Sequence, residues 1–233
     1  MSDSRCRSES EIEMTFQPDH PEITYPLPPE RPQPHRTEPV VVPMVPIGGG
    51  DPWQQLSEQR RILVSGTIDR DAVTALSAQL MAFDGESTRD VEVVVNSSGG
   101  PLEEILPVLD VLGLMRARTN TTCVGSVHGT AVALLAAGTG TRRIASSATV
   151  CLRIDDRQTL TGTTTDIIRR AAELDAIRAR YVAALVATTG LDEDRLEAEI
   201  ASGRSMVASV ARELGIVDVV GEPAGVRASS PHR

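Results

Sequence analysis

Two hydroxyl groups and one imidazole lie within the five residues SVHGT at positions 126–130. Ser126 or Thr130 would act as a nucleophile if a base within about 3 Å accepted its proton. Histidine is the commonest such base, and His128 is the histidine in this segment. That base would also need a partner to orient it. Hydrolysis through a hydroxyl nucleophile is therefore one chemistry that these residue types could support.

Other chemistry is excluded by residue types that the sequence lacks or spaces too widely. All 23 basic residues are arginine, so neither a Schiff-base lysine nor the lysine of a phosphate-binding loop is available. The three cysteines, Cys6, Cys123 and Cys151, include no C-x-x-C pair and form neither a disulfide framework nor a metal cluster. We therefore expect no metal, no cofactor and a reducing compartment.

Charge and hydropathy argue against two classes of partner. The net charge is −9 and the pI is about 5.0, which does not favour binding to a nucleic-acid backbone. The longest apolar run covers residues 131–138, far short of the ~20 residues that cross a bilayer. The first residues, MSDSRCRSESEIE, lack the apolar stretch of a signal peptide. We expect a cytoplasmic protein with no nucleic-acid or membrane partner.

Proline divides the chain into an extension and a domain. Eleven of the 15 prolines lie in residues 1–52, where each removes a backbone donor and disfavours helix at the residue before it. We expect this Pro-rich extension to be largely disordered, residues 53–220 to fold, and residues 221–233 to be a flexible tail. Because aromatic residues are only 2 % of the chain, the core must consist of Ala, Val, Leu and Ile.

Strand and helix patterns alternate along the predicted domain, which indicates α/β layers around a mostly parallel sheet. Asp69 and Pro101 mark the starts of two helices, and Pro107 inside the second predicts a kink. A small-residue helix follows at 129–137 and a long helix at 165–188, and residues 205–220 form a short helix and a final strand. The earlier strands are predicted at 61–66, 91–95, 122–124 and 149–152.

Six segments, in this order, resemble the proteolytic subunit of the Clp protease, a serine peptidase of the crotonase-like superfold. They are RILVSGTID at 61–69, NSSGG at 96–100, CVG at 123–125, LLAAG at 134–138, TG at 189–190 and ELGIVD at 213–218. NSSGG is close to the family's Asn-Ser-Pro-Gly-Gly. The resemblance spans residues 53–220 and implies the family's α/β fold, with the long helix at 165–188 protruding as a handle.

The resemblance also places three residues where the family has its catalytic triad. Gly129 stands at the position of the nucleophilic Ser, Arg153 at that of the His and Glu199 at that of the Asp. Glycine has no side chain to form an acyl-enzyme, and arginine keeps its proton near pH 7. Asp155 and Asp156 follow Arg153 and favour a structural salt bridge with it. The resemblance therefore implies a subunit that has lost its own peptidase chemistry.

The family's oxyanion hole consists of two backbone N–H groups, which correspond here to those of Gly100 and Thr130. Backbone donors need no particular side chain, so this hole can outlast the loss of a triad. We expect an inactive subunit of this kind to hold a peptide carbonyl.

Two alternatives stay open. One is a serine or threonine peptidase rewired through Ser126, Thr130 or His128, although a shift of one residue at a helix start turns a side chain by about 100°. The other is a crotonase-like acyl-CoA enzyme, because SVHGTA at 126–131 resembles the Val-Asn-Gly-x-Ala turn of the enoyl-CoA hydratase group. Against the second alternative, the chain is short and has no second catalytic carboxylate at a recognisable site.

The resemblance finally implies an assembly. The family forms seven-membered rings that stack in pairs through the handle, and its N-terminal segment lines the axial pore and contacts an AAA+ unfoldase. Here Pro43-Met44-Val45 is similar to the start of that segment, and residues 1–42 precede it. We hypothesise that this extension alters pore access or the choice of unfoldase. Rings of this subunit alone would be inert, so we predict mixed rings with active paralogues that act on peptide substrates.

Overall fold

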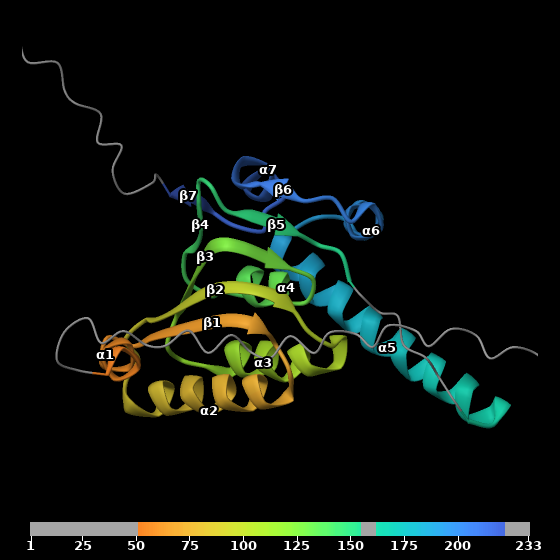
Figure 1. Cartoon of the computed structure of the whole chain (residues 1–233), viewed down its shortest axis with the longest axis horizontal. Coiled ribbons are helices and arrows are strands. Elements are labelled where there is room, and N and C mark those ends of the chain that lie inside the picture. The colour runs from red at the N-terminus through yellow and green to blue at the C-terminus, as the bar shows by residue number, and fades with distance from the viewer. Residues whose placement is uncertain (1–50, 155–161, 222–233) are drawn as a thin grey trace, which may run out of the picture. The chain divides into compact units, whose positions relative to one another are not determined.

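The computed structural model describes residues 51–154 and 162–221 of the chain, and a seven-stranded sheet is the central layer of this part (Figure 1). The strands are β1 (Arg61–Thr67), β2 (Val91–Gly99), β3 (Thr119–His128), β4 (Arg142–Ala145), β5 (Thr149–Cys151), β6 (Met206–Val207) and β7 (Val219–Gly221). The main path runs β1, β2, β3, β4, β7, and all its pairs are parallel. β5 extends the sheet beside the end of β3 and pairs antiparallel with β6.

The described helices connect these strands and cover the sheet. They are α1 (Pro52–Glu58), α2 (Arg70–Glu86), α3 (Leu102–Leu114), α4 (Ala131–Ala136), α5 (Thr164–Thr189), α6 (Glu193–Ser202) and α7 (Ala208–Glu213). α2 packs on α3, while α4 lies against β2 and β3 and contacts both α3 and α5. The α/β fold with a mostly parallel sheet, predicted from the alternating pattern, is confirmed.

Local sequence signals explain where several elements begin and what they bury. The Asp69 carboxylate accepts a hydrogen bond from the N–H of Ala72 at 2.9 Å and starts α2. The apolar residues at helical spacing in α2 are all buried: Val73, Leu76, Leu80 and Phe83. In β2 every second residue is buried, and Val91, Val93 and Val95 of this set belong to the hydrophobic core. α3 runs through Pro107 without ending there.

Four described elements have no counterpart in the sequence prediction. They are α1, β4, α6 and the two-residue strand β6, which lies where the last short helix was predicted to begin. β4 is only four residues long and includes two arginines, and α6 is rich in acidic residues, so neither shows a strong apolar period. The helix predicted from Gly129 begins two residues later, because Gly129 has φ +57°, outside the helical region.

The long helix α5 leaves the body of the domain and confirms the predicted handle (Figure 1). Its C-terminal half is anchored in the core by Tyr181, Val182 and Leu185, which are all buried. In the described part of the chain its N-terminal half is mostly exposed, with Ile168 65 % exposed, and its contact with α3 includes the pair of Arg170 with Glu103 at 3.2 Å.

Arginine side chains tie the ends of several helices to the sheet. The Arg142 guanidinium on β4 donates to the carbonyls of Thr188 at 2.9 Å and Gly215 at 2.8 Å, and pairs with Asp218 at 2.5 Å. The buried Arg60 donates to the carbonyl of Phe83 at 2.8 Å, at the end of α2, and lies over the Phe83 ring. A planar guanidinium can bond several oxygens at once, which suits a chain whose basic residues are all arginine.

Some predictions lie outside the described residues. They concern the extension over residues 1–50, the segment 155–161 with Asp155 and Asp156, and the tail over residues 222–233. No described helix is long and apolar enough to span a membrane.

Candidate functional site

The turn at the end of β2 is built from glycines that allow two backbone segments to approach closely. Gly99 has φ +83°, and a Cβ on it would lie 2.7 Å from the carbonyl oxygen of His128. A Cβ on Gly100 would overlap the carbonyl of Ile68, whose N–H donates to the Gly99 carbonyl at 2.9 Å. Only glycine fits at these two positions, so the Gly-Gly pair holds the turn between β1 and the start of α4.

Gly129 stands opposite this turn, between β3 and α4. Its N–H donates to the carbonyl of Cys151 at 2.8 Å, and its carbonyl accepts from the hydroxyl of Tyr181 at 3.1 Å. Its φ of +57° disfavours any residue with a side chain, and a Cβ there would lie 3.2 Å from the Arg153 carbonyl oxygen. The backbone is therefore shaped around glycine where the resemblance places a nucleophile.

A pocket of about 340 Å³ opens between the two turns. It is lined by Ser98, Gly99, Gly100, Pro101, Gly129, Thr130 and Arg153. The structure thus brings together the predicted oxyanion-hole residues Gly100 and Thr130 with the residues at the predicted Ser and His positions. Among the described residues that line it, Arg153 alone carries a charge.

The two predicted oxyanion-hole residues are hydrogen-bonded to each other. The Gly100 N–H donates to Oγ1 of Thr130 at 2.8 Å, and the Thr130 hydroxyl donates to the Gly100 carbonyl at 3.1 Å. Thr130 is buried, with 2 % of its surface exposed. Its hydroxyl is therefore bonded to backbone rather than to a base.

Glu199, at the predicted Asp position, is bound to another partner. Its carboxylate accepts two hydrogen bonds from the Arg204 guanidinium, at 2.8 and 2.7 Å, and these hold the pKa of Glu199 below its usual range. In residues 51–154 and 162–221, no hydrogen bond or ion pair joins Arg153 to Glu199. The Arg153 side chain runs past Gly203 at the end of α6, since a Cβ on Gly203 would lie 3.4 Å from its Cδ.

The residues of the alternative nucleophile site occupy β3. Ser126 and His128 are two residues apart on this strand and so point to the same face. The Ser126 N–H donates to Oδ1 of Asn96 at 3.2 Å. Among the described residues, no imidazole or carboxylate is hydrogen-bonded to the hydroxyl of Ser126 or Thr130.

The buried cysteines do not form a reactive centre in the described part of the chain. Burial raises the pKa of the Cys123 thiol to about 11, so it stays protonated near neutral pH. The Cys151 thiol donates to the carbonyl of Gly203 at 3.3 Å. No cluster of three His, Cys, Asp or Glu side chains able to hold a metal occurs within the described residues.

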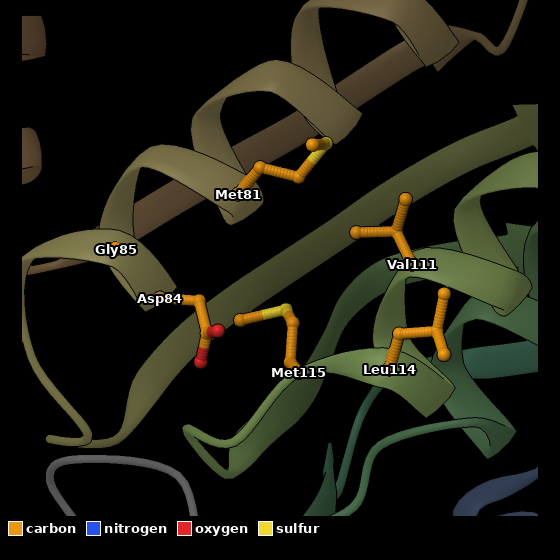
Figure 2. A pocket seen from close by; sticks show the side chains of 6 residues that line it. All are labelled: Met81, Asp84, Gly85, Val111, Leu114 and Met115. Carbon is orange, nitrogen blue, oxygen red and sulfur yellow. The ribbon is translucent and has the colours of Figure 1, made fainter.

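A second pocket, which the sequence did not predict, lies where α2 and α3 end (Figure 2). It measures about 310 Å³ and is lined by Met81, Asp84, Gly85, Val111, Leu114 and Met115. Met81 and Leu114 are 62 % and 84 % exposed. The Asp84 carboxylate accepts from the N–H groups of Arg116 and Ala117, both at 2.8 Å, and these bonds lower its pKa. Asp84 therefore holds the turn after α3, and the pocket surface is otherwise apolar.

Comparison with known proteins agrees with this architecture. A family model described as Clp protease matches residues 49–224. An ATP-dependent Clp protease proteolytic subunit-like protein of Streptomyces coelicolor is 32% identical over 171 residues, which cover 72% of this chain and 81% of that protein. The ATP-dependent Clp protease proteolytic subunit 3 of Nocardia farcinica is 29% identical over 173 residues, covering 73% and 78%. Subunit 1 of Corynebacterium glutamicum is 28% identical over 172 residues, covering 73% and 83%. With a family model matched over most of its length and relatives aligned along most of theirs, the chain belongs to the Clp protease family.

Proposed function

We propose that this chain is a Clp-protease-like subunit without peptidase chemistry of its own, with a structural or regulatory role in a mixed assembly. The observation that carries the proposal is Gly129. It lines the pocket where the family's nucleophile would stand, carries no side chain, and has a backbone φ of +57° with the Arg153 carbonyl close to the missing Cβ. No acyl-enzyme can form at such a position.

The surroundings of Gly129 support the same proposal. Arg153 keeps its positive charge near neutral pH and cannot accept a proton there. Glu199 is engaged by Arg204, and the Thr130 hydroxyl is engaged by the main chain of Gly100. The hydroxyl of Thr130 and the carboxylate of Glu199 are thus already hydrogen-bonded within the chain, and neither is free to take part in a catalytic triad.

Exposed apolar surfaces support assembly with other subunits. Ile167 and Ile168 on α5 face solvent in the single chain, as do Met81 and Leu114 beside the second pocket. Burial of such surfaces is favourable by about 25 cal/mol per Å². We propose that they contact Clp proteolytic paralogues in rings, with an AAA+ unfoldase as a further partner and peptides as the substrates of the active paralogues.

The proposal includes the flanking segments and the compartment. Residues 53–220 would form the domain, and residues 1–52 and 221–233 would flank it. The Pro-rich extension would alter pore access or the choice of unfoldase, and the assembly would act in the cytoplasm. Deletion of residues 1–40 should then change unfoldase affinity or the degradation rate of the assembly. Unchanged ring composition, affinity and rate would reject this part.

The test is the native mass and composition of the tagged full chain purified from its own cells. We expect a large assembly that contains an active Clp paralogue, and the ratio of the two would give the stoichiometry. Recovery of the chain alone as a monomer or small oligomer would contradict the proposal.

A second measurement separates the proposal from the alternatives. The isolated full chain should not hydrolyse a fluorogenic peptide above the level of a buffer control. Hydrolysis that is lost in Ser126→Ala or in His128→Ala would instead favour the rewired peptidase. Binding of acetyl-CoA in calorimetry would favour the acyl-CoA enzyme.

A further inference from the structure

The N–H group of Gly100 already has a partner inside the chain. It donates to the Thr130 hydroxyl oxygen at 2.8 Å, and the same hydroxyl donates to the Gly100 carbonyl at 3.1 Å. Thr130 is buried and lines the pocket together with Gly100. One side chain therefore satisfies both polar groups of the Gly100 main chain.

The neighbouring backbone keeps these two residues in register. A Cβ on Gly99 would lie 2.7 Å from the carbonyl oxygen of His128 and 2.9 Å from the nitrogen of Thr130, so the two turns are in direct contact. On the other side, Gly100 lies against the carbonyl of Ile68. The buried Ser97 adds a hydrogen bond from its hydroxyl to the carbonyl of Gly66 at 2.6 Å. Gly100 is thus held between β1 and the start of α4, with its N–H directed at Thr130.

An oxyanion donor works only if its N–H group is free for the substrate oxygen, because a donor aimed at another oxygen must first break that bond. We propose that the Thr130 hydroxyl is a built-in occupant of the Gly100 N–H and closes this pocket to peptide carbonyls. This inference rests on the proposed function, in which Gly100 stands at the family's oxyanion-hole position. It replaces the expectation that the inactive subunit still holds a peptide carbonyl there.

Three substitutions at Thr130 separate the effect of the hydroxyl group from the effect of the side-chain volume. Thr130→Ala removes the hydroxyl and most of the volume, so the Gly100 N–H becomes accessible from the pocket. Thr130→Ser keeps the hydroxyl and serves as the matched control. Thr130→Val keeps the volume but not the hydrogen bond, so it leaves the N–H unsatisfied and still covered. Only the Ala variant should gain affinity for a peptide carbonyl.

The experiment is hydrogen exchange of the Gly100 amide in the full chain, read at single-residue resolution with and without N-acetyl-tetraalanine amide as the probe. In the wild type and in Thr130→Ser, we expect slow exchange that the peptide does not change. In Thr130→Ala, exchange should be about tenfold faster, and the peptide should slow it again. The measurements on the wild type stand by themselves if a variant does not fold.

Two results would overturn the inference. One is equal Gly100 exchange in the wild type and in Thr130→Ala, and the other is peptide protection of Gly100 in the wild type. Peptide hydrolysis by Thr130→Ala would have a different meaning. It would support the closure at Thr130 and reject the proposed loss of peptidase chemistry, so the two claims fail separately.

Discussion

At the scale of single residues, Gly129 determines what the pocket can do. A serine in its place would have to adopt φ near +57° and bring its Cβ to 3.2 Å from the Arg153 carbonyl oxygen. The left-handed region costs a residue with a side chain about 1–2 kcal/mol. We expect Gly129→Ser to lower the free energy of unfolding in urea by roughly that amount.

The matched control is Gly113→Ser in α3, where the position of the added Cβ is open and φ is not positive. This change should leave stability the same or raise it slightly, since glycine is a poor helix residue. Equal destabilisation by the two substitutions would show that the left-handed backbone of Gly129 is not the cause.

Restoring the triad residues tests the chemistry at the same scale. The triple variant Gly129→Ser, Arg153→His and Glu199→Asp should remain inactive on a fluorogenic peptide. The Thr130 hydroxyl would still occupy the Gly100 N–H, and Arg204 would still bind the carboxylate at position 199. Peptidase activity of the triple variant would contradict this expectation. The single variant Gly129→Ser, which still lacks a base at position 153, is the inactive control.

At the scale of elements, Arg142 joins parts of the chain that lie far apart in sequence. It bonds the end of α5 through Thr188, the turn after α7 through Gly215, and Asp218 before β7. The Arg142 guanidinium holds the pKa of Asp218 below its usual range. The pair therefore stabilises the fold above the unfolded pKa of about 3.9, and this stabilisation is lost as the pH falls toward the lower folded value.

Asp218→Asn should accordingly lower stability near pH 7 by about 1 kcal/mol, a modest value because the Asp218 side chain is 40% exposed. The difference from the wild type should shrink between pH 5 and pH 3, as measured by urea unfolding at each pH. Asp175→Asn, a change at an exposed carboxylate on α5, should show no such pH-dependent difference. A difference for Asp218→Asn that does not change with pH would contradict the role given to the ion pair.

At the scale of the whole molecule, the exposed half of α5 carries the apolar residues Ile167 and Ile168, which the proposed assembly would bury. The C-terminal half is fixed by Tyr181 and Leu185, whereas Ile168 lies on the part that leaves the domain (Figure 1). If α5 contacts another subunit as proposed, Ile168→Glu should reduce the native mass measured by size-exclusion chromatography with light scattering, because burying a charge there is unfavourable.

The control is Val207→Glu, at an exposed apolar residue of β6 away from the handle. It should leave the native mass unchanged. A loss of mass in both variants would point to general instability, and no loss in Ile168→Glu would place the subunit contacts elsewhere on the surface.

Much of this protein follows from sequence alone because its signals are local. Asp69 marks the start of α2, and the apolar run at residues 91–95 marks β2. The Gly99-Gly100 pair can be read in the sequence, whereas the close contacts that require it are made by Ile68 and His128 in the fold. The residue types alone show that position 129 has no side chain and that position 153 has no base able to accept a proton near pH 7. The order of these segments also sufficed to identify the family.

Other properties were decided only by tertiary structure, because they depend on residues that are distant in sequence. Thr130 and Gly100 are 30 positions apart, and no local pattern indicates that the hydroxyl of one would occupy the N–H of the other. The apolar pocket between α2 and α3 likewise follows from side-chain packing. Glu199 and Arg204 are only five positions apart, but their pairing depends on the turn at Gly203 that ends α6. The sequence determined which chemical groups are present, and the fold decided which of them are already bound to one another.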